Sequence, residues 1–223
     1  MYIHTHTESR AENVRLSSVN DCKKRKVLVF GAGVIGAYLA HVLIHAGNEV
    51  TILAREERVQ SLKQNGLVIR HHLQRTTTKD AVEAVTDVSG RSFDAAFVVM
   101  PFHKIQMAMP QIARLQTKLL VLVGNDPVPA EIEAELAKAP GIKKILFGFQ
   151  VSGGKKEADQ YVCERFGGSW MDLGQLHGSA DTRLKKWTER LFAGTSYKLK
   201  WQEDMEAYLI CHPAAILPIA YLS

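Results

Sequence analysis

Three glycines lie at the spacing of a dinucleotide-binding turn. Gly31, Gly33 and Gly36 form a G-x-G-x-x-G pattern between an apolar run and a helical pattern. In such a turn the first glycine permits the bend, the second lets the backbone approach a diphosphate, and the third allows close helix–strand packing. The competing interpretation is a glycine turn that binds no ligand. The predicted cofactor loop consists of Gly31, Ala32, Gly33, Val34, Ile35 and Gly36.

An arginine follows the second predicted strand of the same unit. Arg55 comes two residues after the apolar segment EVTIL, where an acidic residue would bind ribose hydroxyls and repel a 2′-phosphate. The planar guanidinium of an arginine reverses this preference, because it pairs with phosphate oxygens. Arg58, one helical turn later, is a candidate second contact. The pattern favours NADP over NAD, and the alternative is a solvated arginine at a strand end.

The elements around these residues alternate between strand and helix. Buried parallel strands are predicted at the apolar runs KVLVF, EVTIL, FDAAFVVM, KLLVLVGND and KKILFGFQ. Helical patterns lie between them, beginning near residues 34, 56, 103 and 129. This alternation predicts an α/β fold of the Rossmann type, with a doubly wound, mostly parallel sheet.

The last third of the chain departs from this alternation. The segment YVCERFGGSWMDLG predicts two short strands around Gly167 and Gly168, paired as an antiparallel edge hairpin. A helical pattern returns from Thr182 to Phe192 and is followed by a strongly apolar segment. We therefore expect a disordered leader at 1–25, an NADP-binding Rossmann domain at 26–180, and a helical segment at 181–223 that begins an incomplete substrate domain.

Charge and apolar patterning narrow the possible partners. The net charge is +5, and residues 1–26 hold six basic and three acidic side chains, so +3 comes from this polar leader. No stripe of arginine and aromatic residues follows, so no nucleic-acid partner is expected. No apolar run reaches the roughly 18 residues that cross a membrane. A small-molecule substrate and a cytoplasmic location are predicted.

The cysteines and the leader histidines indicate no metal site. Cys22, Cys163 and Cys211 are widely spaced and form no C-x-x-C pair. This spacing suggests a reducing compartment and argues against a disulfide framework and structural zinc. His4 and His6 lie in the polar leader, and the pair is interpreted as part of a disordered tail.

The glycine-rich segment VLVFGAGVIGAYLAHVLIHAGNEVTILAR closely resembles the opening of the ketopantoate reductase (2-dehydropantoate 2-reductase) family. The likeness continues through FDAAFVVM, VLVGND, GGSWMDLG and HPAAILPIA, from about Lys26 to the C-terminus. The resemblance implies a Rossmann domain followed by an all-helical substrate domain, and hydride transfer from NADPH to a 2-oxo acid. It also implies that Arg55 contacts the 2′-phosphate and that Asn125 lies near the nicotinamide and substrate.

Two lysines of the family pattern are replaced. Pro101 stands where the family carries a lysine after FDAAFVVM, and Lys104 is the nearest substitute. The family's proton-donating lysine follows a tryptophan, whereas this chain continues from Trp201 with Gln-Glu-Asp. His212 is the remaining candidate donor, because its ordinary pKa suits proton transfer; the alternative is a histidine satisfied in the core. The predicted catalytic residues are thus Asn125, Lys104 and His212.

The family's helical domain continues well beyond the length of this chain. We expect a truncated or short relative whose apolar segment, from Met205 to Leu222, packs on the Rossmann domain or joins two subunits as a homodimer. The leading hypothesis is an NADP-dependent reductase of a 2-oxo acid or related ketone. The alternatives are a non-catalytic NADP-binding protein or inactive truncated relative, and an ordinary Rossmann dehydrogenase acting on an alcohol or amino acid.

Overall fold

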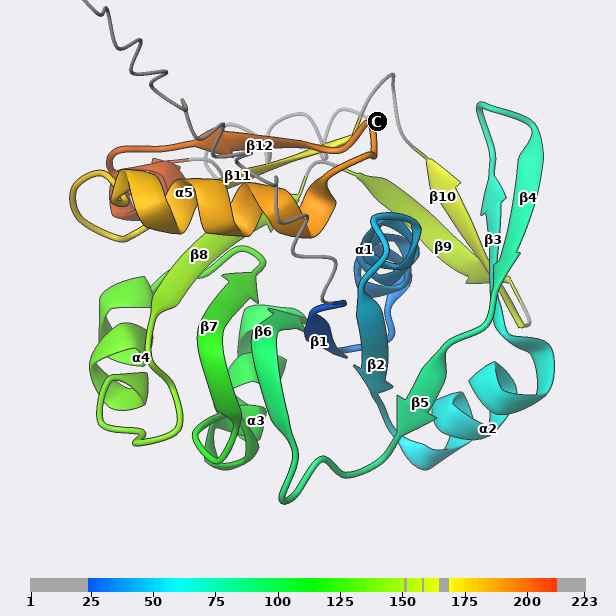
Figure 1. Ribbon diagram of the computed structural model, residues 1–223, viewed down its shortest axis with the longest axis horizontal. Coiled ribbons are helices and arrows are strands. Elements are labelled where there is room, and N and C mark those ends of the chain that lie inside the picture. The colour runs from blue at the N-terminus through cyan, green and yellow to red at the C-terminus, as the bar shows by residue number, and fades with distance from the viewer. Residues whose placement is uncertain (1–23, 151, 158, 165–168, 212–223) are drawn as a thin grey trace, which may run out of the picture.

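The computed structural model describes residues 24–211, apart from 151, 158 and 165–168 (Figure 1). The predicted leader therefore lies outside the described residues except for Lys24 and Arg25. His212 and the Gly167–Gly168 turn also lie outside them, as does most of the apolar segment that begins at Met205. The predictions made for these positions stay predictions.

An eight-stranded sheet forms the centre of the molecule, in the order β12-β11-β8-β7-β6-β1-β2-β5. Its inner strands are buried apolar runs. This is expected for strands that pair with a neighbour on each side and have other elements packed on both faces of the sheet. The strands are β1 (Lys26–Phe30), β2 (Glu49–Leu53), β5 (Glu83–Val85), β6 (Ser92–Val99), β7 (Gln116–Val123), β8 (Ile145–Gln150), β11 (Trp170–Gly174) and β12 (Lys198–Trp201).

The strand order reverses direction at β1. The chain moves from β1 to β2 on one side and then returns to β6 on the other side of β1. Both pairings are parallel, with Val27 opposite Val50 of β2 and Ala95 of β6. A reversal of this kind opens a crevice at the carboxyl ends of the strands, which is where α/β sheets bind ligands. The predicted Rossmann-type fold is confirmed.

Helices and a second sheet cover the two faces. One face packs on α1 (Val34–His45), on the short turn η1 (Arg190–Phe192) and on the second sheet. The opposite face packs on α3 (Phe102–Ile112), α4 (Pro129–Leu136) and the helical residues 205–211. Successive residues of the strands alternate between these two cores, as Val27 and Leu28 do in β1.

The second sheet has four strands in the order β4-β3-β10-β9, and it lies against α1 (Figure 1). Its members are β3 (Leu67–His71), β4 (Thr76–Asp80), β9 (Gly153–Glu157) and β10 (Gln160–Glu164). An antiparallel edge hairpin is present, but the predicted partner strands are wrong. β10 pairs with β9 and β3, whereas β11 pairs with β8 and β12 in the main sheet. Tyr161 and Cys163 of β10 are buried in the same core as the side chains of α1.

The segment predicted as helical from residue 181 contributes a strand. Asp181 caps α5 (Thr182–Glu189) by accepting a hydrogen bond from the Leu184 N–H at 2.8 Å. The chain then returns through η1 to β12, which pairs in parallel with β11. The segment KLKW alternates exposed and half-buried side chains, so it lacks the continuous apolar run that marks the buried strands of the sheet.

The helical residues 205–211 follow directly after β12. Met205 and Leu209, four residues apart, are buried in the same core as α3 and α4. Ile210, on the opposite side of this helix, is 54% exposed. This part of the predicted apolar segment therefore packs on the Rossmann domain, and the predicted homodimer stays a prediction. None of the helices in the described residues is long and apolar enough to cross a membrane.

Candidate functional site

The glycine loop connects the carboxyl end of β1 to α1. The Gly31 N–H donates to the Leu53 carbonyl of β2 at 3.1 Å, so the loop bends towards the neighbouring strand end. Gly31 has φ of +116°, and a Cβ there would lie 2.2 Å from the Val99 carbonyl oxygen of β6. Gly31 therefore fits tightly between the ends of β2 and β6, at the reversal of the sheet.

The space above Gly33 is open. A Cβ built at Gly33 meets no heavy atom within 4 Å, whereas one at Gly36 would lie 2.0 Å from the Gly31 carbonyl oxygen. Gly36 is thus needed for packing inside the protein, while Gly33 faces a space that the described residues leave unfilled. This contrast is what a turn that receives a diphosphate on its second glycine requires.

The start of α1 is suited to negative charge. Gly33 is its N-cap residue, and no side chain caps this end of the helix. The first turn, which begins with Val34 and Ile35, contains no acidic residue. Backbone N–H groups and the positive end of the helix dipole favour phosphate at such a position. The loop residues Ala32, Gly33, Val34 and Ile35 fit the diphosphate of a dinucleotide.

Two arginines lie beyond β2, in different surroundings. Arg55 is the N-cap residue of α2 (Glu56–Asn65) and is exposed. The Arg58 guanidinium lies over the Tyr161 ring, with its carbon 5.2 Å from the ring centroid. Its Nη1 is buried and finds no hydrogen-bond partner among the described residues. Arg55 is free to reach a ligand at the strand end, and Arg58 holds a buried donor close to the loop.

Tyr161 joins this arginine to the glycine loop, and sequence analysis did not identify it. Its hydroxyl donates to the Ala32 carbonyl oxygen at 3.0 Å. Burial raises the pKa of Tyr161, against the opposing effect of the nearby Arg58 charge, so the hydroxyl remains a donor at neutral pH. No local signal could have revealed the contact, since Ala32 and Tyr161 are 129 residues apart.

Lys104 and Asn125 lie at the carboxyl ends of two paired strands. Pro101 is the N-cap residue of α3, and Lys104 is exposed in the first turn of this helix, beyond β6. Asn125 is exposed two residues after β7. Because β6 and β7 are parallel neighbours, both residues lie on the same edge of the sheet as the glycine loop. The third predicted catalytic residue, His212, is outside the described residues.

The residue after Asn125 is a buried acid that sequence analysis did not single out. Asp126 is 3% exposed, and its Oδ1 accepts a hydrogen bond from the Val128 N–H at 3.3 Å. Its Oδ2 is buried and finds no hydrogen-bond partner in the part of the chain that is described. Burial raises the pKa of Asp126 above its ordinary value. A carboxyl group whose ionised form is disfavoured by burial therefore lies at the end of β7.

The residues after Trp201 have structural partners. Gln202 donates from Nε2 to the Asp172 carboxylate at 2.7 Å. Asp204 accepts a hydrogen bond from the Ala207 N–H at 2.9 Å and so caps the helical residues 205–211. Glu203 is exposed between them. In this chain the positions after Trp201 thus connect β11, β12 and the following helix.

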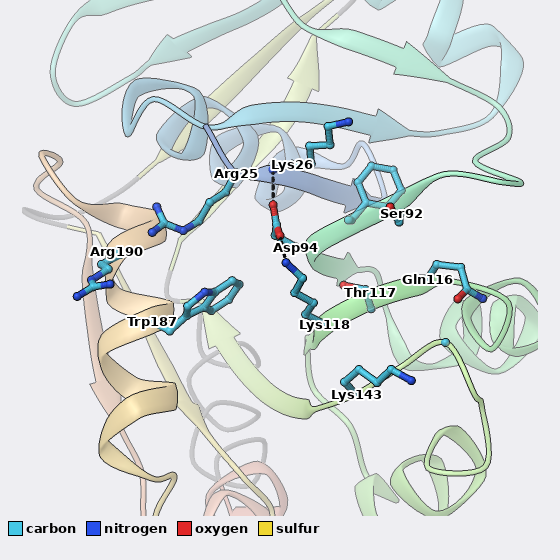
Figure 2. A pocket seen from close by; sticks show the side chains of 12 residues that line it. Arg25, Lys26, Ser92, Asp94, Gln116, Thr117, Lys118, Lys143, Trp187 and Arg190 are labelled. Atoms are coloured by element: carbon cyan, nitrogen blue, oxygen red, sulfur yellow. Dashed lines mark hydrogen bonds and ion pairs between the residues drawn. The ribbon is translucent and has the colours of Figure 1, made fainter. Parts of the chain in front are cut away.

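A cavity of about 560 Å³ lies at the other edge of the sheet (Figure 2). It is lined by the first residues of β1, β6 and β7 and by Trp187 and Arg190 near α5. Inside it the Asp94 carboxylate receives the Lys118 ammonium at 2.6 Å and the Lys26 backbone N–H at 3.0 Å. This cavity lies at the amino ends of the strands and is separate from the glycine loop.

The sequence of this chain matches one family model. The model is described as ketopantoate reductase PanE/ApbA, and it matches residues 27–178, which is more than half of the chain. The matched range includes the glycine loop, Arg55, Lys104 and Asn125.

Individual relatives are more distant. The chain is 30% identical over 87 residues to the Uncharacterized oxidoreductase YkpB of Bacillus subtilis (strain 168), which covers 39% of this chain and 28% of that protein. It is 17% identical to the solved probable 2-dehydropantoate 2-reductase panE of Bacillus subtilis, with a TM-score of 0.63, covering 81% of this chain and 59% of that one.

A second solved structure that is similar to this chain contains NADH. The solved D-mandelate dehydrogenase with NADH and anilino(oxo)acetate is 19% identical, with a TM-score of 0.63, and the match covers 79% of this chain and 56% of that one. At these identities the structural likeness shows the fold alone. This chain spans less than two thirds of the length of each of these three relatives.

Proposed function

Because this chain belongs to the ketopantoate reductase PanE/ApbA family, we propose that it is an NADP-dependent reductase of a 2-oxo acid or related ketone. The observation that carries the proposal is the open space above Gly33, in a loop otherwise packed against β6 and its own helix. A turn that bound no ligand would have no need of a glycine at this position, since its φ of −79° suits any residue.

The choice of NADP rests on Arg55. Its exposed side chain begins α2 at the end of β2, next to the strand end that receives the Gly31 N–H. A guanidinium there pairs with a 2′-phosphate, whereas NAD presents only a ribose hydroxyl. NADH is bound in the similar D-mandelate dehydrogenase structure. The expected preference of this chain for NADP therefore depends on its own Arg55.

A bound reduced nicotinamide would supply the hydride for the ketone carbon, and a side chain would have to supply the proton that the ketone oxygen takes to give a 2-hydroxy acid. The side-chain amide of Asn125 orients the substrate by hydrogen bonding at the end of β7. The ammonium of Lys104 stabilises the negative charge that develops on the oxygen. Lys104 and His212 are the two candidate proton donors.

Cofactor binding is tested by titrating the protein with NADPH and with NADH. We expect the wild type to bind NADPH more tightly, and Arg55→Ala to weaken NADPH about 10- to 100-fold while leaving NADH unchanged, as loss of a charge-assisted hydrogen bond predicts. Arg114→Ala, which removes another exposed arginine, is the matched control. Equal affinity of the wild type for the two cofactors would refute the NADP assignment.

The glycine loop is tested in the same assay. Gly33→Ala should leave the free energy of unfolding nearly unchanged, because a Cβ there meets no atom within 4 Å. It should nevertheless abolish NADPH binding by filling the space proposed for the diphosphate. Undiminished binding by this variant would show that the loop does not receive the cofactor.

Turnover is tested by following NADPH oxidation with a panel of 2-oxo acids. We expect at least one substrate to be reduced, and Asn125→Ala to lower kcat/KM without changing the affinity for NADPH. Lys104→Ala and His212→Ala separate the two proton donors, since loss of the true donor lowers the rate at neutral pH. NADPH binding without turnover of any 2-oxo acid would favour the non-catalytic alternative.

A further inference from the structure

Two histidines and an aspartate meet on the side of α1 that faces the second sheet. His41 and His45 are four residues apart in α1 and therefore project from the same side of the helix. The Nδ1 of His41 lies 2.6 Å from Oδ2 of Asp80, and the Nε2 of His45 lies 2.9 Å from Oδ1 of the same carboxylate. One carboxylate thus bridges two imidazole rings.

These groups come from separate elements that the fold brings together. Asp80 is the last residue of β4, and its side chain is 9% exposed. The rings of His41 and His45 lie side by side, with centroids 4.3 Å apart. One potential ligand atom from each of the three residues lies within 4.8 Å of the other two. No metal site is predicted from the amino-acid sequence, because nothing in the sequence shows that Asp80 faces α1.

We propose that His41, His45 and Asp80 bind a divalent transition-metal ion of the zinc type. Two imidazole nitrogens and one carboxylate oxygen are a donor set that Zn²⁺ prefers, and the i, i+4 spacing on a helix presents both nitrogens to one ion. Ions such as Mg²⁺ and Ca²⁺ require mostly oxygen ligands and do not suit this site.

The present distances require only a small adjustment. Tetrahedral ligands of Zn²⁺ lie about 3.3 Å apart, given metal–ligand distances of about 2.0–2.1 Å. The nitrogen–oxygen pairs must therefore open by about half an ångström from the hydrogen-bonded distances. Binding replaces the two hydrogen bonds to Asp80, and both imidazoles then bind as neutral ligands. The side chain of His45 is 54% exposed, so its ring can rotate and admit the ion.

The three proposed ligands differ in how far their side chains are buried. The side chains of His41 and Asp80 are 12% and 9% exposed, so packing fixes two of the three ligands. The His71 ring lies 5.3 Å from the His41 ring, and its Nε2 is 3.0 Å from the Thr78 hydroxyl. His71 thus supports the ligands from β3. The exposed side at His45 leaves a coordination position for water.

The site is distinct from the proposed cofactor site. His41 and His45 lie in the second half of α1, about 12–18 Å along the helix from Gly33 at its start. A metal ion here joins α1 to the end of β4 and so fastens the second sheet to the main domain. The proposed role is structural, because the ion is held away from the strand ends where Lys104 and Asn125 lie.

The experiment uses the full chain after removal of metal with a chelator, in a background with His4→Ala and His6→Ala that eliminates the leader histidines. We expect one Zn²⁺ to bind per chain and to raise the Tm by at least about 3 °C at saturating concentration. Mg²⁺ and Ca²⁺ should not change the Tm. Added Co²⁺ should give visible absorption bands of a nitrogen- and oxygen-ligated ion.

The matched variants are His45→Ala and His72→Ala. His45→Ala removes a half-exposed ligand and should abolish both the Zn²⁺-dependent rise in Tm and the Co²⁺ bands. His72→Ala removes an exposed histidine of the β3–β4 turn and should leave both unchanged. The proposal is overturned if the parent chain shows neither effect, or if His45→Ala retains them.

Discussion

Asp126 is a buried acidic residue at the end of β7 that lowers the stability of the fold when its side chain is ionised. Its carboxylate is almost fully buried beside Asn125, and one oxygen finds no hydrogen-bond partner among the described residues. An unpaired buried polar group costs about 1–3 kcal/mol, so the residue is unfavourable for the fold when ionised. Such costs are commonly found at functional sites. The carboxyl group is therefore a further feature of the strand end that Asn125 occupies.

We predict that Asp126→Asn stabilises the protein at pH 7 by about 1 kcal/mol. Burial raises the pKa of Asp126 in the folded state, so its contribution to stability is present below the unfolded pKa and is lost as pH rises through the folded pKa. The difference in the free energy of unfolding between the variant and the wild type should vanish in acid. Denaturant unfolding at pH 7 and near pH 3, below the ordinary pKa of an aspartate, measures it.

The control for this prediction is Asp181→Asn. Asp181 is an exposed N-cap residue, and asparagine caps a helix about as well as aspartate. This variant should show no such dependence on pH. A destabilised Asp126→Asn at pH 7 would mean that the ionised carboxylate is stabilised by a group that the described residues do not include.

At the scale of elements, the second sheet positions the glycine loop. β10 places the Tyr161 hydroxyl on the Ala32 carbonyl and the Tyr161 ring beneath the Arg58 guanidinium. Gly154 of β9 has φ of +143° and approaches so closely that a Cβ would lie 3.0 Å from Val34 in the first turn of α1. The loop is thus held both by the main sheet and by the neighbouring strands.

We predict that Tyr161→Phe lowers the free energy of unfolding by about 1 kcal/mol, as loss of one hydrogen bond to the backbone does. It should also weaken NADPH binding several-fold, because the loop loses a contact that fixes its shape. Unfolding and titration of the same samples measure both effects. Tyr208→Phe is the control, since that hydroxyl bonds Asp172, away from the loop. Equal losses of NADPH affinity in both variants would contradict the proposed role.

The elements differ in how far the sequence predicts them. The inner strands of the main sheet are continuous apolar runs, such as LLVLV in β7, and the glycine pattern marks the turn after β1. Short strands are predicted near GLVIRHH, TTTKD and YVC, but not their assembly into a second sheet, because β4 and β9 read TTTKD and GGKKE, with few apolar residues and no alternation. Its central pairing of β3 with β10 joins segments far apart in the sequence. Periodicity carries no information about such a pairing.

The residues of the candidate site also differ in how far the sequence predicts them. Gly31, Gly33, Gly36 and Arg55 belong to one local βαβ unit, so their spacing was enough to place them at one strand edge. Tyr161 and the burial of Asp126 depend on the packed fold and could not be predicted locally. Likewise, His41 and His45 are visible as a helical pair, but their aspartate partner comes from another element.

At the scale of the whole molecule, the residues after β12 are part of the main core. Met205 and Leu209 are at most 1% exposed and pack with side chains of α3 and α4. If this helix only began a separate domain, the core on this face of the sheet would be fully packed without its side chains. The burial instead indicates that the described helix after β12 unfolds together with the Rossmann domain.

We predict that Met205→Ala destabilises the whole described domain by about 2–4 kcal/mol, as large-to-small substitutions in a core do. Ile210→Ala, on the exposed side of the same helix, should change stability by less than about 0.5 kcal/mol. Denaturant unfolding followed by tryptophan fluorescence and by circular dichroism measures both. Two separate transitions, of which Met205→Ala shifts only one, would show that the helix belongs to an independent unit.

The pairing of β3 with β10 also sets an order of events during protein synthesis. The hairpin of β3 and β4 leaves the ribosome long before β9 and β10, yet β3 finds its parallel partner only when they have emerged. Until then the nascent chain exposes the side of α1 that these strands will cover. The glycine loop therefore receives its support from Tyr161 late, and a growing chain completes the proposed cofactor site only after β9 and β10 have been made.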